Sequence, residues 1–288
     1  MVLCDCCSIS NLVYGLGLFV IAKTLIPIIL SFVKKNKEPE LNEKDWKKDV
    51  VYLFQFKGNS TLSSLSPFCV KVEAFLRLNN IPYERRYSLS VRGKNGKLPL
   101  VELNGEQIAD SQIILMRLAQ KYNIKDYDTT EKAGMGRAVE RMVANHTFFH
   151  ITYFKFQHPG PLLKMMMEGV VPDFLAGLAI PVVKLLFAGR VKKGIEGAVG
   201  QFTEDEHKEL IRDDFTALKN ILGDKKFLMG DKATAADCIL FGHLSALYYL
   251  APGTKYYPSE LIDSAEYSTL KQWLERMKDT AFGNEFHT

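Results

Sequence analysis

The sequence contains few cysteines, and their spacing excludes a disulfide framework. Five occur among 288 residues, three of them within the first seven positions and the other two, Cys69 and Cys238, far apart in the chain. A framework of bridges needs several cysteines distributed through a small domain. The body of the chain is therefore expected to fold in a reducing compartment and to keep isolated thiols.

Runs of basic residues interleaved with aromatic residues are also missing, which argues against nucleic-acid binding. The formal net charge is only +4. Hydrophobic residues make up 47% of the chain and charged residues 24%, which are the proportions of an ordered globular protein, so extended disorder is not expected. The length suffices for two packed subdomains, each with a core.

Lysine and arginine are absent from the first eleven residues, ahead of a long apolar run. Residues 12–33 would extend about 33 Å as a helix, which is enough to cross the hydrocarbon core of a bilayer. We interpret the run as a transmembrane helix, although Lys23 and Pro27 interrupt it. A cleaved signal peptide is the alternative, and it is disfavoured because no basic segment precedes the run.

The lysines that follow the apolar run set its expected orientation. Lys34, Lys35 and Lys37 come directly after it, and positive residues mark the cytoplasmic side of a membrane helix. We therefore expect a single-pass membrane protein with a cytosolic globular part, in the endomembrane system or the lysosomal membrane. Residues 34–48 are interpreted as a polar linker that tethers this part.

The first segment, residues 1–11, is rich in cysteine, with Cys4, Cys6 and Cys7. These thiols would lie beyond the membrane, or at the headgroups as acylation sites if the helix is re-entrant. Thiolates also bind soft metal ions, but three cysteines leave such a site incomplete. No metal site is predicted for the chain.

Residues 49–125 are predicted to form a small α+β domain. A short run of β-branched and aromatic residues at 50–56 is typical of a buried strand, and an amphipathic helix is expected from Pro67 to about Asn79. Asn104-Gly105 is a strong hairpin turn. The remaining strands are expected at residues 82–87, 98–103 and 107–109, and a helix capped by Asp110 or Ser111 at 112–122.

The segment Ser66-Pro67-Phe68-Cys69 lies where the first strand passes into the first helix. It has the form of a Cys-x-x-Cys redox motif in which serine replaces the first cysteine. Unpaired N–H groups and the helix dipole stabilise a thiolate at such a helix start. Serine cannot exchange disulfides there, but it can donate a hydrogen bond to the thiolate of another molecule.

This element order, together with the SPFC segment, a strand that begins with Pro99 and the Asp110-Ser111 cap, resembles the thioredoxin-fold half of glutathione S-transferases. The resemblance implies that Ser66 activates the glutathione thiol, with Ser63 and Ser64 as nearby competitors. Glutathione would then be a co-substrate of the protein.

The resemblance also implies where the tripeptide is held. In that family the proline is cis, and the backbone of the preceding residue pairs with glutathione; Leu98 and Pro99 match these positions. Asp110 and Ser111 match the pair that holds the γ-glutamyl carboxylate at a helix N-terminus, with aspartate in place of the commoner glutamate. Lys97 is a candidate for the glycine end, although it is equally explained as a solvated loop residue.

Each of these features also has an ordinary structural explanation. A proline at the start of an edge strand and an Asp-Ser cap are common architectural devices, so the order and spacing carry the signal. Cys69 lies one turn into the helix and is interpreted as a small core residue, with a nucleophilic role as the alternative.

Residues 130–288 are predicted to form an all-helical domain, beginning with one long helix from Glu131 to about Phe156. His146 and His150 are four residues apart and could share a metal ion on one helix face. No carboxylate or cysteine nearby in the sequence completes the set, so we favour packed, hydrogen-bonded imidazoles.

Residues 161–190 form an unusual apolar tract. The part from 170 to 188 has about the length of a minimal membrane span, but Asp173, Lys184 and two prolines interrupt it. We interpret the tract as helical pieces on the core or on the membrane surface. A second span is the alternative.

Two capping boxes support the helical prediction. Thr203 with Glu206, and Thr234 with Asp237, have the spacing in which each side chain of the pair caps the backbone of the other residue. The second box resembles the one that nucleates the central helix of the transferase family. It is evidence for the fold and not for catalysis.

Three segments, SLSPFCVKVEAFLRLNNIPYE, GIEGAVGQFTEDE and FLMGDKATAADCILFGHL, together with the N-terminal extension, resemble the failed-axon-connections and metaxin-like branch of that superfamily. The anchor is most similar to the nematode cadmium-responsive proteins. The resemblance implies a fold that is frequently membrane-associated, a role in handling cadmium or other stress, and a homodimer.

Three functions follow from these observations. The chain could be a membrane-anchored glutathione transferase that attacks a small hydrophobic electrophile with a Ser66-stabilised thiolate. It could be a membrane-tethered adaptor or binding protein that keeps the fold without turnover, as the tract at 161–190 and the aspartate at position 110 favour. Direct metal binding by the N-terminal cysteines is the weakest as chemistry.

Overall fold

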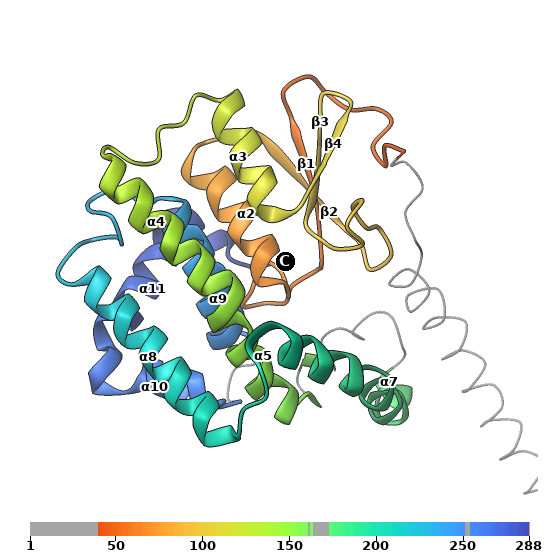
Figure 1. Ribbon diagram of the computed structural model, residues 1–288. Coiled ribbons are helices and arrows are strands. Elements are labelled where there is room, and N and C mark those ends of the chain that lie inside the picture. The colour runs from red at the N-terminus through yellow and green to blue at the C-terminus, as the bar shows by residue number, and fades with distance from the viewer. Residues whose placement is uncertain (1–39, 161, 164–172, 251–253, 288) are drawn as a thin grey trace, which may run out of the picture.

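The computed structural model describes residues 40–160, 162–163, 173–250 and 254–287. Figure 1 shows a small sheet with helices α2 and α3 beside it, and a larger group of helices against the other side of α2. The predicted membrane helix at 12–33 and the Cys-rich segment 1–11 lie outside the described residues. The α+β class and the succession of a sheet-containing half and a helical half are confirmed.

The sheet has four strands in the order β2-β1-β3-β4. β2 pairs parallel to β1, and the other two pairings are antiparallel. The β3–β4 hairpin turns through Asn104 and Gly105, both with positive φ, as the Asn-Gly pair predicts. The strands are β1 (Val51–Gln55), β2 (Tyr83–Tyr87), β3 (Leu100–Leu103) and β4 (Glu106–Ala109).

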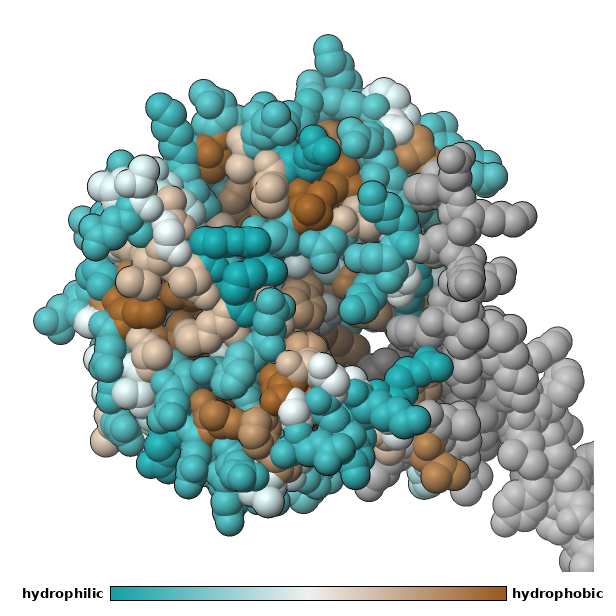
Figure 2. Space-filling view, in the orientation of Figure 1, coloured by the Kyte–Doolittle hydropathy of each residue, from teal (hydrophilic) through white to brown (hydrophobic). Residues whose placement is uncertain are grey.

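β1 is buried along its whole length because both faces of the sheet are covered. Val51 and Leu53 point into the large core, which continues through α2 (Pro67–Leu78) and α3 (Ser111–Lys121) into the helical half. Tyr52 and Phe54 belong to a smaller cluster on the opposite face. On the face shown in Figure 2, apolar residues lie in patches separated by hydrophilic ones.

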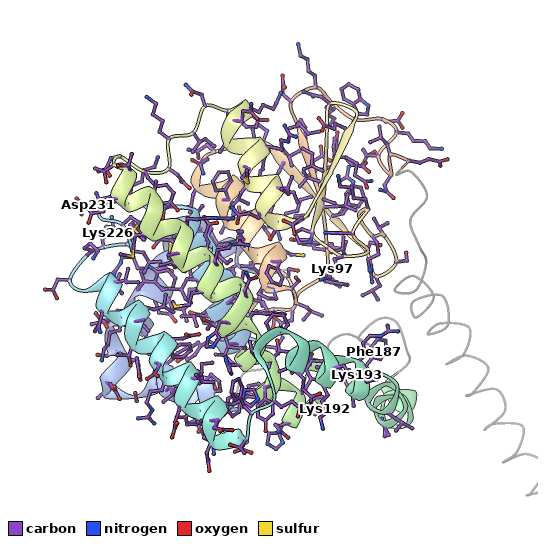
Figure 3. All side chains as sticks on the ribbon, viewed as in Figure 1. Lys97, Phe187, Lys192, Lys193, Lys226 and Asp231 are labelled. Carbon is purple, nitrogen blue, oxygen red and sulfur yellow. The ribbon has the colours of Figure 1, made fainter. Side chains whose placement is uncertain are left out.

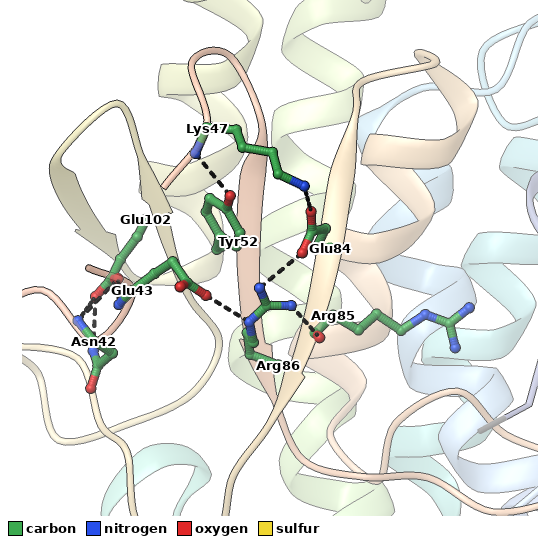
Figure 4. Close-up of polar contacts among 8 residues, drawn as sticks. All are labelled: Asn42, Glu43, Lys47, Tyr52, Glu84, Arg85, Arg86 and Glu102. Atoms are coloured by element: carbon green, nitrogen blue, oxygen red, sulfur yellow. Dashed lines mark hydrogen bonds and ion pairs between the residues drawn. The ribbon is translucent and has the colours of Figure 1, made fainter. Parts of the chain in front are cut away.

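Residues 40–48, the described end of the predicted linker, lie against the sheet (Figure 4). The Glu102 carboxylate, only 2% exposed, accepts hydrogen bonds from the backbone N–H groups of Asn42 (2.9 Å) and Glu43 (2.8 Å). Glu43 in turn pairs with Arg86 on β2 at 2.8 Å, and Lys47 N–H donates to the Tyr52 hydroxyl. This part of the linker is therefore held by the domain and is not a free tether.

The first long helix of the helical half is interrupted where the sequence predicts continuity. A π-helical turn, η1, separates α4 from α5. Such turns often occur at functional sites. The helices of this half are α4 (Thr130–Met142), η1 (Val143–Thr147), α5 (Phe148–Gln157), α7 (Asp173–Val199), α8 (Glu204–Leu222), α9 (Ala235–Tyr248), α10 (Tyr257–Asp263) and α11 (Ser268–Ala281), with short turns η2 (Ala265–Tyr267) and η3 (Gly283–Glu285).

The unusual tract contributes α7, which runs through Pro181 and packs against α5. Its Leu185 side chain is 81% exposed. Within the described ranges, no helix combines the length and the apolarity needed to cross a membrane. The expectation of helical structure in this tract holds for the described residues, and its contact with a membrane stays a prediction.

The two halves meet where α9 crosses α2. A Cβ atom at Gly242 would lie 2.2 Å from the Pro67 carbonyl oxygen, so glycine allows the two backbones to approach. We expect Gly242→Ala to lower the free energy of unfolding by about 3 kcal/mol, because backbone atoms must move apart. Chemical denaturation measures this change.

The exposed helical Gly134 is the matched control. A Cβ atom there would meet nothing within 4 Å, so Gly134→Ala should stabilise α4 by about 0.5–1 kcal/mol. Equal effects of the two substitutions would refute a close α2–α9 crossing.

Candidate functional site

The first helix of the sheet-containing half starts at the SPFC segment. Pro67 occupies the first helical position, and Ser66 is the N-cap residue with an extended backbone. Ser66 is half-buried, whereas Ser63 and Ser64 are completely buried. Of the three candidate serines, Ser66 is thus the one that a ligand can reach.

Cys69 is buried under the sheet edge, as its interpretation as a core residue expects. It has no exposed surface and packs with Leu98 and Leu100. Burial raises the pKa of its thiol to about 11, and hydrogen bonds from the Ser66 and Ser64 hydroxyls only partly offset this. A thiol with this pKa stays protonated at neutral pH and is a poor nucleophile.

Leu98 and Pro99 lead into β3 through a cis peptide bond, and both are buried. Leu100 pairs with Ala109 across the β3–β4 hairpin, so Pro99 and Asp110 flank neighbouring positions at the same edge. Lys97 precedes them on an exposed loop (Figure 3). The structure therefore brings the Pro99 corner and the Asp110-Ser111 corner together.

Asp110 caps α3 with its own side chain. Its Oδ1 atom accepts hydrogen bonds from the N–H groups of Gln112 (2.9 Å) and Ile113 (3.2 Å). Its φ of 81° lies in a region that costs a non-glycine residue about 1–3 kcal/mol. Ser111, 7% exposed, starts the helix. The Asp110 side chain thus satisfies two of the free N–H groups at the start of α3.

Two cationic side chains converge on Gln112, next to Ser111. Lys71 of α2 donates to Gln112 Oε1 at 2.8 Å, and Arg141 of α4 donates to the same oxygen at 3.2 Å. Burial lowers the pKa of Lys71 to about 8. This pair adds positive charge near the start of α3, and the buried Glu140 carboxylate, which raises the pKa of Lys71, offsets part of it.

A further cation lies near the Ser66 corner. Arg92, from the loop before Pro99, packs over the Phe56 ring at 5.3 Å and interacts electrostatically with Cys69. Burial lowers the pKa of Arg92 to about 10.

The sequence alone does not identify Lys71, Arg92 or Arg141 as candidate site residues. Lys71 had a detectable signal, because it is a lysine on the otherwise apolar face of the predicted α2 helix. Arg92 and Arg141 had none, since a loop arginine and a helical arginine are ordinary surface residues in sequence.

His146 and His150 form a hydrogen-bonded chain with a third histidine. The Asp214 carboxylate pairs with His146 Nδ1 at 2.9 Å, His146 Nε2 lies 3.2 Å from His150 Nε2, and His150 Nδ1 lies 2.7 Å from His207 Nδ1. The geometry agrees with packed imidazoles. In the described part of the chain, no group of three or more histidine, cysteine, aspartate or glutamate side chains is arranged to hold a metal ion.

Family models match the two halves separately. The glutathione S-transferase N-terminal domain matches residues 67–160, and the glutathione S-transferase C-terminal domain matches residues 211–277. The chain belongs to the glutathione S-transferase-like superfamily. Residues 161–210 lie between the two matches and are covered by neither.

The relatives place the chain within this superfamily. It is 34% identical to Failed axon connections of Drosophila melanogaster over 84% of this chain, and spans 60% of the length of that relative. It is 24% identical to a Metaxin-2 homolog of Caenorhabditis elegans over 71% of this chain and 90% of the relative. The chain is thus a member of the failed-axon-connections and metaxin-like branch.

A solved structure of similar fold is a glutathione S-transferase from Methylobacterium radiotolerans in complex with glutathione sulfonate. It has a TM-score of 0.53 and 17% identity, and the similarity covers 83% of this chain and 95% of that one. This likeness establishes the shared fold.

Proposed function

We propose that the chain binds glutathione across Ser66, Leu98-Pro99 and Asp110-Ser111, and we refer to this position as the proposed glutathione groove. The convergence of Lys71 and Arg141 on Gln112 is the observation that carries the proposal, because it places two cations beside the start of α3. The γ-glutamyl carboxylate would accept hydrogen bonds from Ser111. The same ligand is suggested by the similar fold of the M. radiotolerans glutathione S-transferase, which was solved in complex with glutathione sulfonate.

The thiol of the bound tripeptide would lie at Ser66. Support for this position comes from the half-buried Ser66 side chain at the N-cap of α2, which a ligand sulfur could approach. A hydrogen bond to the thiolate and the nearby Arg92 charge would both lower the pKa of the glutathione thiol. Lys97 would pair with the glycine carboxylate from its exposed loop.

An apolar wall beside Ser66 suits a hydrophobic electrophile. The Phe68 ring, two residues after Ser66, lies 5.1 Å from Phe148 of α5 and 4.9 Å from the buried His243 of α9, so aromatic side chains from both halves meet at the start of α2. The protein would then conjugate glutathione to a small apolar electrophile.

The setting of this activity belongs to the proposal as well. An anchor at residues 12–33 would hold the domain at a cytosolic membrane surface of the endomembrane system or lysosome. Glutathione conjugation there suits defence against cadmium or other stress, as in the nematode cadmium-responsive proteins that the anchor resembles. A homodimer follows the family's habit.

The second candidate is a membrane-tethered binding or adaptor protein without turnover. Residues 161–210, which neither family model covers, add α7 against α5. This addition changes the helical side of the fold, where transferases of this superfamily receive their electrophile. An adaptor would keep glutathione affinity and show no conjugation.

Ser66→Ala separates the two candidates. The substitution should reduce conjugation of chlorodinitrobenzene by about 10- to 100-fold, because a hydrogen bond to a charged thiolate is lost. Glutathione affinity, measured by equilibrium dialysis on the full-length chain, should change by less than about threefold, since Ser66 contacts the thiol and not the anchoring carboxylates.

Cys69→Ser is the control for this measurement. It changes a side chain next to Ser66 without removing the Ser66 hydroxyl, and its conjugation rate should stay within about threefold of the original. Conjugation that is equal in Ser66→Ala and the unchanged chain would remove Ser66 from the mechanism. Glutathione binding without any conjugation would establish the adaptor.

A further inference from the structure

A cavity of about 430 Å³ lies between α5 and the C-terminal part of α7. Its wall is mainly aromatic and aliphatic, with Tyr153, Phe156, Ile195 and Phe202 among the lining residues. Lys192, labelled on α7 in Figure 3, and Glu196 are 3.7 Å apart at the same cavity. The volume lies in the range of small-molecule sites.

One polar side chain is held inside this apolar lining. His207 of α8 is 2% exposed and borders the cavity. The Tyr153 ring stacks on it at a centroid distance of 3.8 Å, and Phe202 meets it edge-on at 5.8 Å. The imidazole is therefore fixed in position by its neighbours.

The histidine chain determines which nitrogen of His207 can meet a ligand. Asp214 also accepts a hydrogen bond from the Thr147 hydroxyl, so His146 Nδ1 acts as a donor to the carboxylate. With His146 neutral and its Nδ1–H given to Asp214, His146 Nε2 accepts from His150 Nε2–H, and His150 Nδ1 accepts from His207 Nδ1–H. Nε2 of His207 ends the chain as an acceptor, and it has no hydrogen-bond partner among the described residues.

This cavity is separate from the proposed glutathione groove. Phe148 and Lys155 of α5 face α2 and α9 through the Phe68 ring and the Ala246 carbonyl. His150 and Tyr153 lie on the opposite side of the helix, toward His207 and α7. Most of the lining, from Ala188 to His207, falls in residues 161–210, which neither family model covers.

We propose that this cavity binds a small, uncharged aromatic hydroxyl compound, whose ring stacks against Tyr153 and Phe202 and whose hydroxyl donates to Nε2 of His207. The aromatic lining suits a flat ring. One acceptor, His207 Nε2, matches one hydroxyl donor on the ligand. A ligand without a donor would leave this nitrogen without a hydrogen bond and would bind more weakly.

The protonation states of His150 and His207 support an uncharged ligand. Burial lowers the pKa of His150 to about 3, with the neighbouring His146 and His207 adding to the effect, and burial also lowers the pKa of His207. A neutral imidazole accepts a hydrogen bond from a hydroxyl without holding its proton. A phenolate would meet a neutral imidazole at His207, and the cation at this cavity, Lys192, is paired with Glu196 at 3.7 Å.

β-Naphthol and β-naphthyl methyl ether test the proposal. They share one ring system, and only the naphthol can donate a hydrogen bond. In calorimetric titrations of the full-length chain, we expect β-naphthol to bind about tenfold more tightly than the ether. His207→Phe keeps an aromatic ring against Tyr153 and should reduce the naphthol preference to less than about twofold.

Two further variants keep the test decisive if His207→Phe fails to fold, which circular dichroism would reveal. Ala188 lines the cavity on its exposed side, so Ala188→Trp adds a large side chain at the entrance without changing His207, and it should abolish binding of both compounds. His287→Phe, at the exposed C-terminal end, should leave both affinities unchanged.

Equal affinity of the unchanged chain for the two compounds would reject the role of His207. Binding that persists in Ala188→Trp, or no binding of naphthol at all, would reject the cavity as its site. None of these outcomes depends on glutathione binding, so this proposal and the glutathione site can fail separately.

Discussion

Replacing Asp237 by alanine is expected to lower the free energy of unfolding by about 4 kcal/mol or more. Its buried carboxylate accepts four hydrogen bonds, from Leu228 N–H, Thr234 N–H, the Thr234 hydroxyl and Trp273 Nε1–H. The donors lie on the loop before α9, on the N-cap of α9 and on α11. Alanine would leave them buried without an acceptor, and each such loss costs about 1–3 kcal/mol.

Urea denaturation followed by circular dichroism measures this loss. Asp231→Ala is the matched control, because Asp231 lies on the same connection, is exposed, and stands at the edge of the molecule (Figure 3). Its effect should stay within about 0.5 kcal/mol. Similar unfolding midpoints for the two variants would contradict the assignment of Asp237 as the residue that ties α9 to α11.

Replacing Ser111 by alanine is expected to weaken glutathione binding by about 10- to 100-fold. In the proposed complex, the Ser111 hydroxyl donates to the γ-glutamyl carboxylate, and hydrogen bonds to charged groups contribute about 1.5–3 kcal/mol. Asp110 already accepts from the next two N–H groups of α3, so few other donors can replace the lost hydroxyl. Calorimetric titration gives the change in affinity.

Ser264→Ala is the control, because it removes a serine hydroxyl in the same way at a position away from the proposed site. Ser264 precedes η2 in the helical half, where its hydroxyl donates to the Leu261 carbonyl, and it should leave glutathione affinity unchanged. Unchanged unfolding midpoints in both variants would show that Ser111→Ala weakens glutathione binding without lowering the stability of the fold. An unaltered affinity in Ser111→Ala would place the carboxylate elsewhere.

The fold could be predicted from sequence where local chemistry decides it. Asn104-Gly105 fixes the hairpin because both positions need positive φ. The Thr203 and Thr234 capping boxes mark the starts of α8 and α9 because their partners lie three residues on. Such signals lie within a few residues of the structure they determine.

Features that depend on distant contacts could not be predicted in this way. The π-helical turn at residues 143–147 has no local signal, and it carries His146 toward Asp214, 68 residues away. The docking of residues 40–48 depends on Glu102, which is buried only when β3 is in the sheet. The composition of this segment indicates a linker, and its contacts make it part of the domain.

The candidate site likewise has residues that local sequence signals identify and residues that only distant contacts bring to it. Ser66, Pro99 and Asp110 could be identified as candidates from the sequence, because the order of the motifs that contain them can be read along the chain. The cations invoked in the proposed site come from separate segments of the chain, and only the folded chain brings Lys71 and Arg141 to Gln112.

Calorimetric titration of glutathione and of cysteinylglycine onto the full-length chain tests the central claim most directly. Cysteinylglycine keeps the thiol and the glycine end and lacks the γ-glutamyl group that Ser111 would hold. The account predicts saturable binding of one glutathione per chain and affinity at least 10-fold lower for cysteinylglycine, because the anion at α3 is missing. No heat of binding with glutathione at millimolar concentration, or equal affinity for the two peptides, would contradict it.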